Sequence, residues 1–174
     1  ESKPFERKHG DAVIFEGIHA LNPDVITVPD SKLYKLYVSV RTRITKEGIV
    51  LNPAKIRLMR RMIRDRNFRK RSLEETMSMY NSVQAGENKY IMPYKTRSDY
   101  DIDTFLAYEM SVYRYNLLDD LRLMENKHEL SDVIEILSSL APMDNELVPR
   151  DALIREFIGN KAQLHVQVVS TIAE

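Results

Sequence analysis

The sequence contains no cysteine, no tryptophan and only five glycines among its 174 residues. Without cysteine it can form neither a disulfide framework nor a thiolate metal site, which fits a reducing compartment. None of the glycines belongs to a GxxxxGK[ST] loop, whose backbone N–H groups would cradle the phosphates of a nucleotide. The usual phosphate-binding loop is therefore absent from these residues.

The sequence also lacks any apolar run that approaches the roughly 20 residues needed to cross a bilayer. Residues 1–10, ESKPFERKHG, do not have the pattern of a signal peptide. We therefore expect a cytoplasmic protein with no membrane partner. The length suits one domain with a small appendage, and 43% hydrophobic residues can supply an ordinary core.

No charge sign dominates the chain, because 26 Lys and Arg balance 26 Asp and Glu. Against this neutral background, residues 57–71, RLMRRMIRDRNFRKR, hold seven arginines and one lysine but a single acid, Asp65. A neutral chain that concentrates positive charge in one place is expected to hold an anion there. Phosphate is the obvious candidate, because the planar guanidinium group binds it through two hydrogen bonds at once.

Two short apolar segments are typical of strands. Residues 12–15, AVIF, predict a buried parallel strand that ends at Glu16, and residues 33–40, LYKLYVSV, predict a second strand. Open α/β sheets bind ligands at the carboxyl ends of their strands, so Glu16 is a candidate site residue. A strand-end charge that simply faces water is the alternative. Residues 41–51 are expected to form a connection.

Asn52 and Pro53 predict the start of a helix, with Asn as the N-cap and Pro in the first helical position. Apolar residues then recur with a helical period at Ile56, Met59, Met62 and Ile63. The remaining faces carry Arg57, Arg60, Arg61 and Arg64. We therefore expect an amphipathic helix whose cationic side is exposed toward a neighbouring cleft.

The pattern breaks at residues 67–71, and Ser72 with Glu75 then forms a capping-box signature. A helix is expected from Ser72 to a stop at Gly86, followed by a loop over 89–103 with a short strand at 100–102. Further helices are expected from 103 or 104 to about 127, over 131–140, and over 150–158 with Gly159 as its end. The last fifteen residues, 160–174, fit a strand or a helix equally.

Several segments, taken in order, resemble the second half of a uridine kinase and, more broadly, the uridine kinase and phosphoribulokinase family of P-loop kinases. They are FEGIHAL at 15–21, LYVSV at 36–40, the arginine-rich stretch at 57–83 and KYIMPYKTRSDYDID at 89–103. In that family a strand ends in Glu-Gly-Ile, and a later helix-loop-helix carries an arginine-rich lid of the form RxxRRxxRDxxxRGR. The resemblance covers residues 11–110, and the ending LIREFIG is similar to that of a bacterial nucleoside-kinase branch.

The resemblance implies roles for individual residues. Glu16 matches the family glutamate that helps to organise Mg²⁺, usually through water, near the transferring phosphate, which makes it a candidate catalytic and metal-site residue. Tyr80 lies in the helix after the lid, where the family places residues that face the substrate. The residues that match phosphate-contacting lid arginines are Arg61, Arg64, Arg69 and Arg71, with Arg64 also a candidate for catalysis.

Two departures from the family pattern affect these roles. Lys70 replaces the glycine that is usual between the last two arginines, so the turn of the lid is expected to be stiffer or differently shaped. Met79 is a substrate-site position at which uridine kinases have a glutamine that reads the pyrimidine base. A thioether cannot donate and accept as an amide does, which puts uracil or cytosine specificity in doubt.

The implied fold is α/β: a P-loop kinase-like parallel sheet flanked by helices, C-terminal portion only, with a helical tail. Residues 1–130 would form the C-terminal part of the kinase-like domain, including the lid at 57–71, and residues 131–174 a helical extension. The phosphate loop and the strand with the catalytic aspartate would precede residue 1. The exposed sheet edge that this leaves predicts self-association into a homo-oligomer.

The implied function is part of an ATP-dependent nucleoside kinase that transfers the γ-phosphoryl group to a sugar hydroxyl, with ATP and Mg²⁺ as cofactors. Its partners would be a nucleotide and a nucleoside or phosphorylated-sugar substrate. The isolated chain is expected to be inactive, because a phosphotransferase needs a phosphate cradle, a metal and a group that positions the nucleophile.

Two other functions stay open at this stage. A basic helix can bind a nucleic acid or another polyanion, although the flanking chain is not basic and Phe68 is the one aromatic residue among the arginines. A regulatory protein could keep a kinase-like fold without the chemistry. The plainest alternative for the arginines is a solvated helix face that pairs with acids such as Glu74 and Glu75.

Overall fold

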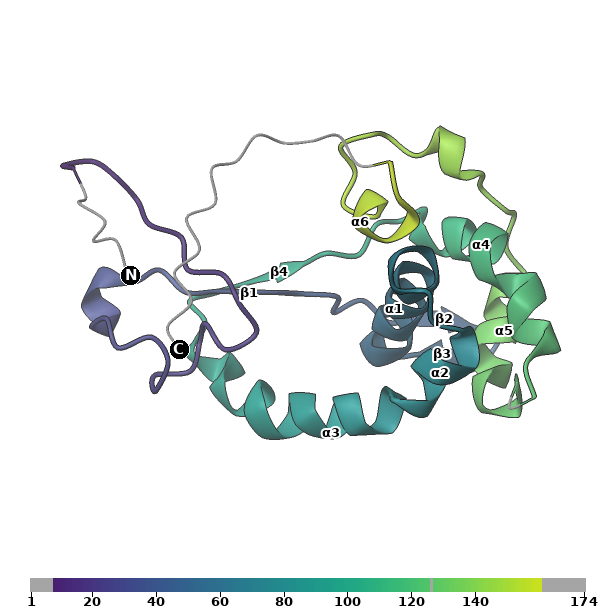
Figure 1. Cartoon of the computed structure of the whole chain (residues 1–174), viewed down its shortest axis with the longest axis horizontal. Coiled ribbons are helices and arrows are strands. Elements are labelled where there is room, and N and C mark those ends of the chain that lie inside the picture. The colour runs from purple at the N-terminus through teal and green to yellow at the C-terminus, as the bar shows by residue number, and fades with distance from the viewer. Residues whose placement is uncertain (1–7, 126, 161–174) are drawn as a thin grey trace.

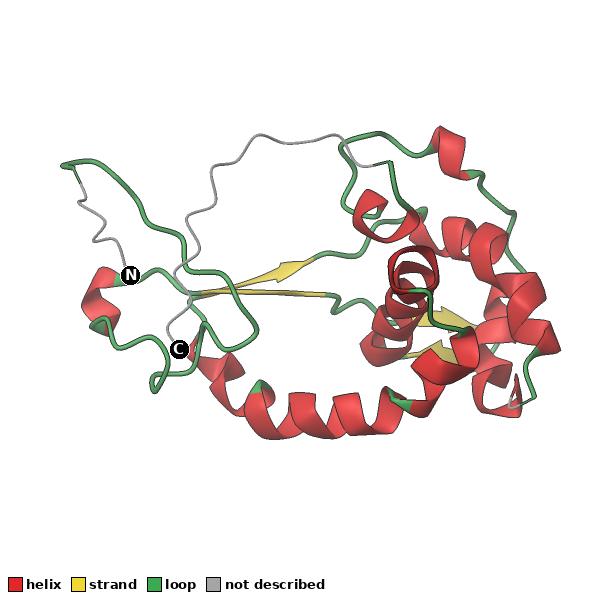
Figure 2. Ribbon diagram, in the orientation of Figure 1, coloured by secondary structure: helices red, strands yellow, loops and turns green. Residues whose placement is uncertain are grey.

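The computed structural model describes residues 8–125 and 127–160, which form a mixed α/β chain (Figures 1 and 2). The strands are β1 (Leu36–Ser39), β2 (Ile44–Lys46), β3 (Ile49–Leu51) and β4 (Tyr100–Asp103). The α-helices are α1 (Pro53–Arg69), α2 (Leu73–Ser78), α3 (Tyr80–Tyr90), α4 (Glu109–Leu123), α5 (Ser131–Ser138) and α6 (Arg155–Ile158). Short 3-10 helices are η1 (Asp30–Lys32), η2 (Met92–Arg97), η3 (Lys127–Leu130) and η4 (Asn145–Leu147).

The elements form a helical body from which a two-stranded ribbon extends (Figure 1). The body gathers α1, α2, α4, α5 and α6 around the short hairpin of β2 and β3. The ribbon consists of β1 and β4, which are parallel, while α3 leads away from the body on the same side as the ribbon. The N-terminal segment and η1 lie at the far end of the ribbon (Figure 1).

Strands β1 and β4 pair in a register that places their apolar side chains on one face. Leu36 lies opposite Tyr100 and Val38 opposite Ile102, and all four of these side chains are exposed. The other face carries Tyr37, whose hydroxyl contacts the sulfur of Met92 in η2 at 3.9 Å. The strand predicted at 33–40 is confirmed for residues 36–39, and the strand predicted at 100–102 is confirmed as β4. In the described residues, however, the parallel sheet has only these two strands.

Helix α1 begins as the sequence predicts. The Asn52 side chain accepts a hydrogen bond from the Lys55 backbone N–H, and Pro53 opens the first turn. The predicted stripe is fully buried, and α4, α5 and α6 complete the core around it. The helix ends at Lys70, the position at which the resembled family has glycine, and Lys70 adopts the left-handed conformation with φ 54°. Left-handed backbone at the end of a helix is the reason glycine is favoured there.

Residues 41–51, expected to be a plain connection, form the antiparallel hairpin of β2 and β3. Its two-residue turn is Glu47-Gly48, and both residues have positive φ, as a tight type I′ turn requires. Leu51 is completely buried, so the hairpin contributes to the core. The hairpin was not predicted because its turn has Glu-Gly, whereas Asn-Gly or Asp-Gly is the usual turn sequence.

The prediction of a buried strand over residues 12–15 is wrong. These residues are irregular, and Val13, Ile14 and Phe15 are 45%, 87% and 52% exposed. A short apolar run forms a strand only where a neighbouring strand or helix covers it, and the described residues supply no such neighbour. Glu16 consequently follows a loop and not a strand.

Several predicted helix limits also need correction. Ser72 and Glu75 form the predicted capping box, but α2 ends at Ser78 and α3 continues through Gly86 to Tyr90. Helix α4 begins at Glu109 instead of 103 or 104, and its N-cap makes no side-chain hydrogen bond. The predicted helix over 150–158 shrinks to α6, which Gly159 ends with φ 94° as expected. Apart from Asn160, the segment 160–174 lies outside the described residues.

One hydrophobic core runs through the helical body on both sides of residue 130. Val133, Ile136 and Leu137 of α5 are buried in the same cluster as Leu117 and Leu121 of α4. The division into residues 1–130 and 131–174 stays a prediction. Over the residues described, none of the helices combines the length and the apolar character that crossing a bilayer demands.

Candidate anion-binding site

The structure separates the seven arginines of residues 57–71 into two groups by their partners. Three pair with acids elsewhere in the chain: Arg57 with Glu87, Arg60 with Glu109 and Arg66 with Asp120, at 2.7, 2.6 and 2.6 Å. The other four are Arg61, Arg64, Arg69 and Arg71. These four are the arginines that the sequence analysis singled out for phosphate binding.

Asp65 lies at the centre of the second group. Its Oδ1 accepts hydrogen bonds from the Arg64 Nε and Nη2 at 3.1 and 3.0 Å. The same oxygen lies 3.2 Å from the Arg69 Nη1, and Oδ2 lies 3.7 Å from the Arg71 Nη1. Three guanidinium groups therefore surround one carboxylate. We call Asp65 and these three arginines the Asp65 cluster.

The end of α1 explains how residues on both sides of a helix terminus meet. The left-handed Lys70 turns the chain back, so that the backbone N–H groups of Lys70 and Arg71 both donate to the Asp65 carbonyl oxygen. This turn brings Arg71 to the same carboxylate as Arg69, which is one helical turn after Asp65. The aspartate is placed by the helix period, because it lies three residues after the buried Met62.

The charges of the Asp65 cluster do not cancel. The side chain of Asp65 is only 1% exposed, whereas those of Arg64, Arg69 and Arg71 are 28%, 50% and 43% exposed. One buried negative charge therefore holds three positive charges that remain open to solvent. Such an arrangement can accept an anion through guanidinium N–H groups that the aspartate does not use.

Arg61 and Tyr80 line one shallow groove between α1 and α3, together with Arg57, Gln84 and Glu87. Within the described part of the chain, Arg61 has no carboxylate within ion-pair distance. Burial lowers the pKa of its guanidinium, and the nearby charge of Arg64 lowers it further. Burial also disfavours the charged form of the Tyr80 hydroxyl and therefore raises its pKa. This hydroxyl accepts a hydrogen bond from the Gln84 Nε2 at 2.9 Å. The groove thus adds one more cation beside the Asp65 cluster.

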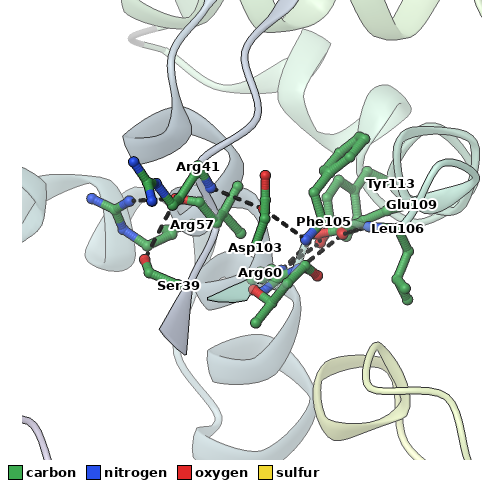
Figure 3. Close-up of polar contacts among 11 residues, drawn as sticks. Ser39, Arg41, Arg57, Arg60, Asp103, Phe105, Leu106, Glu109 and Tyr113 are labelled. Atoms are coloured by element: carbon green, nitrogen blue, oxygen red, sulfur yellow. Dashed lines mark hydrogen bonds and ion pairs between the residues drawn. The ribbon is translucent and has the colours of Figure 1, made fainter. Parts of the chain in front are cut away.

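Arg60 is not on an exposed cationic face, contrary to the prediction. Its guanidinium forms a bidentate pair with the buried Glu109, and its Nη2 also donates to the Thr104 carbonyl oxygen at 2.7 Å (Figure 3). The Tyr113 hydroxyl donates to the same glutamate. Burial alone would lower the pKa of Arg60, but the hydrogen bonds and charge interactions with Glu109 and Tyr113 together outweigh burial and raise the pKa. Arg60 is thus committed to joining α1 to α4.

The carboxyl ends of β1 and β4 are tied together by Asp103 (Figure 3). Its carboxylate accepts hydrogen bonds from the Arg41 N–H at 3.0 Å, the Thr42 hydroxyl at 2.7 Å and the Phe105 N–H at 3.0 Å. Slight burial would raise the pKa of this carboxyl, but these hydrogen bonds outweigh it and lower the pKa. Asp103 therefore has a structural role, and it lies at the edge of the sheet where a parallel sheet would bind its ligand.

The remaining predicted site residues lie apart from the cluster. Glu16 is exposed in the N-terminal loop, and in the described residues no hydrogen bond or ion pair joins it to the other candidates. Met79 is half-buried at the junction of α2 and α3, immediately before Tyr80. The structure thus brings together Arg64, Arg69 and Arg71, and places Arg61 with Tyr80, but it does not bring Glu16 to either.

The chemistry of the donor groups suits phosphate better than a metal ion. Four arginines have no acid partner outside the run among the residues described, and they offer forked N–H donors, which match phosphate oxygens. Over residues 8–125 and 127–160 no three His, Cys, Asp or Glu side chains gather as a metal would require.

The role of Asp65 was not predicted from the sequence. Its signal was present, because Asp65 is the one acid in a basic run and falls on the helical period of the buried stripe. A charged residue on a buried face is expected to have partners, and here the partners are the neighbouring arginines. Arg60 is also a charged residue on the helical period of the buried stripe, because it lies four residues after the buried Ile56.

Comparisons with protein-family models, with curated proteins and with solved structures gave no significant match to this chain.

Proposed function

We propose that this chain carries the arginine-rich lid of an ATP-dependent nucleoside kinase with a P-loop kinase-like fold. The observation that carries the proposal is the separation of the arginines. In the part of the chain that the structure describes, Arg61, Arg64, Arg69 and Arg71 have no acid partner outside the run, while the other three pair with acids of other helices. The order of the segments that resemble a uridine kinase supports the same assignment.

In this function the four arginines bind and neutralise phosphate oxygens. Bound ATP, with Mg²⁺, would supply the phosphoryl group that is transferred to a sugar hydroxyl. Forked guanidinium donors fixed around Asp65 would stabilise the charge that spreads over the phosphoryl oxygens and would help to exclude water. Arg64 is the candidate for direct contact with the reacting group.

The groove between α1 and α3 is where we place the acceptor substrate. Tyr80 and Arg61 line it, and Met79 directly precedes Tyr80 in the sequence. An aromatic ring can pack against a base or a sugar, while Arg61 can reach a phosphate held by the cluster. Glu16 would assist Mg²⁺ through water only in a conformation that brings the N-terminal loop toward the lid.

A nucleotide titration of this chain tests the proposal. We expect a fluorescent ATP analogue to bind, and we expect Arg64→Ala and Arg71→Ala each to weaken binding by roughly tenfold, the loss of about 1.4 kcal/mol. Arg66→Ala is the matched control, because Arg66 is on the same helix but pairs with Asp120. No phosphate release is expected, since the chain has no phosphate-binding loop.

Equal affinities for the wild-type protein, Arg64→Ala and Arg71→Ala would contradict the lid assignment. A nucleic-acid or polyanion function would show a different signature. Binding to an oligonucleotide would then exceed binding to ATP, would fall steeply with salt, and would weaken equally in Arg66→Ala.

A further inference from the structure

Asp65 is an unusual residue to find beneath an anion-binding surface. Its carboxylate is buried, it lies under arginines that are to hold a second anion, and its Oδ2 has no hydrogen-bond partner among the described residues. A negative charge in this place repels any anionic ligand. If the surface binds an anion, Asp65 must favour binding in another way by more than this repulsion disfavours it.

We infer that Asp65 is a positioning residue that holds Arg64, Arg69 and Arg71 as one preformed site for an anion with at least two adjacent negative charges, of the pyrophosphate type. The inference deepens the proposed function, because it concerns the same arginines. It names how they are held and what class of anionic group they take.

Holding the arginines in place before the ligand arrives lowers the conformational entropy that binding costs. Arginine has a long side chain that loses much rotamer freedom when it is fixed, and three of them would have to be fixed together by the ligand. In the Asp65 cluster the carboxylate already fixes Arg64 through two hydrogen bonds and draws in Arg69 at 3.2 Å. The ligand then meets donors that are in place before it arrives.

The hydrogen-bond donors that Asp65 does not use also favour binding. Arg64 uses its Nε and one terminal nitrogen on Asp65, and Arg69 uses one terminal nitrogen. Arg71 approaches Oδ2 only to 3.7 Å, which is beyond hydrogen-bond distance. Since each guanidinium has five N–H donors, most of them are left for a ligand.

The surplus positive charge of these arginines determines the class of ligand that the site would take. Three arginines and one aspartate leave a surplus of two positive charges, and Arg61 nearby adds a third. A single phosphate group carries about −1.5 to −2 charges at pH 7, so it would leave part of the surplus of three uncompensated. Two linked phosphate groups match it and present oxygens over a width that several separate forks can reach.

Asp65→Asn distinguishes positioning from simple electrostatics, because the two predict opposite results. Removing a negative charge from beneath the site should strengthen anion binding if only net charge matters. If Asp65 positions the arginines, binding of inorganic pyrophosphate should instead weaken by about tenfold, which is about 1.4 kcal/mol. Asp120→Asn is the matched control, because Asp120 pairs with Arg66, which lies outside the Asp65 cluster, and it should leave binding unchanged.

Isothermal titration with chloride, phosphate and pyrophosphate provides the measurement. We expect pyrophosphate to bind tightest in the wild-type protein and its advantage over phosphate to shrink in Asp65→Asn. Tighter pyrophosphate binding by Asp65→Asn would overturn the positioning role. Equal binding of phosphate and pyrophosphate by the wild-type protein would overturn the ligand class.

Arg64→Lys keeps the test decisive if Asp65→Asn does not fold. This half-exposed residue can be replaced without opening the core, and lysine keeps the charge while losing the fork that pairs with Asp65. Lysine also loses the fork that binds phosphate, so Arg71→Lys is the matched control, because Arg71 approaches Asp65 only to 3.7 Å. A larger loss of pyrophosphate affinity in Arg64→Lys than in Arg71→Lys supports positioning, and equal losses contradict it. Failure of the kinase proposal is separable, because pyrophosphate would then still bind as described, while ATP would bind no more tightly than pyrophosphate and no nucleoside would bind.

Discussion

At the scale of single residues, Arg60 and Glu109 form the most buried ion pair in the described chain, with side chains 10% and 0% exposed. Two hydrogen bonds join them, and Thr104 and Tyr113 use further donors and acceptors of the pair. The Arg60 guanidinium also lies over the ring of Phe157, 5.2 Å from its centre. The pair thus joins α1 to both α4 and α6.

We expect Glu109→Ala to reduce the free energy of unfolding by about 3 to 5 kcal/mol, because it leaves Arg60 buried without a counter-charge. Urea unfolding followed by circular dichroism measures this change. Asp120→Ala, which breaks an exposed pair with Arg66, should cost no more than about 1 kcal/mol. Similar losses for the two variants would show that burial of the Arg60 pair is unimportant.

The sequence indicated which residues carry charge but not which charges meet. Arg60 and Asp65 both fall on the buried side of α1, and their partners differ in kind. Asp65 pairs with Arg64 one residue earlier and with the arginines four and six residues later, which a local pattern can reveal. Glu109 is 49 residues away from Arg60, so only the tertiary fold brings the two together.

At the scale of elements, Asp103 ties the ends of β1 and β4 through three hydrogen bonds that its charged form accepts. The pKa of this carboxyl is lowered in the folded protein, so the folded state favours the deprotonated form. The resulting stabilisation is present above the ordinary aspartate pKa of about 3.9 and is lost as the pH falls through the lower, folded value.

We therefore expect the stability of the wild-type protein to decline as the pH falls from about 5 to about 3, because the Asp103 carboxyl begins to take up a proton in this range. Asp103→Asn should be less stable near neutral pH and should decline less over the same range. Urea unfolding at a series of pH values provides the measurement. Asp30 and Asp144 also have lowered pKa values, so the difference between the two proteins is the informative quantity. Parallel curves would contradict the role of Asp103.

Elements with a local signal were predicted well. The cap at Asn52, the capping box of Ser72 and Glu75, and the end of α6 at Gly159 depend on side chains within a few residues. The segment at 12–15 failed because an apolar run becomes a strand only when another element covers it. The β2–β3 hairpin was missed because Glu47 is an unusual residue for a turn with positive φ.

At the scale of the whole molecule, the apolar face of the β1–β4 ribbon is exposed. Leu36, Val38, Tyr100 and Ile102 lie on it in register. Exposed strands with apolar side chains offer both unpaired backbone groups and a surface that favours burial. The sequence analysis expected an exposed edge, but the pairing that creates this face depends on segments far apart in the chain.

We expect this chain to associate as its concentration rises, and we expect Val38→Lys and Ile102→Lys to reduce that association. Light scattering over a concentration series measures the change in mean mass. Val50→Lys is the matched control, because Val50 is equally accessible but lies on β3, away from the ribbon. A monodisperse monomer at every concentration, or an equal effect of Val50→Lys, would contradict the prediction.

The ribbon also has a consequence for the order of folding. Leu36 and Tyr100 are 64 positions apart, and the hairpin, α1, α2, α3 and η2 all lie between them. Closing so long a loop costs conformational entropy that four paired residues on each strand repay only poorly. The helices, whose contacts are local, can form earlier. The two strands should therefore pair last, and in native-state hydrogen exchange their amides should open well before those of the buried stripe of α1.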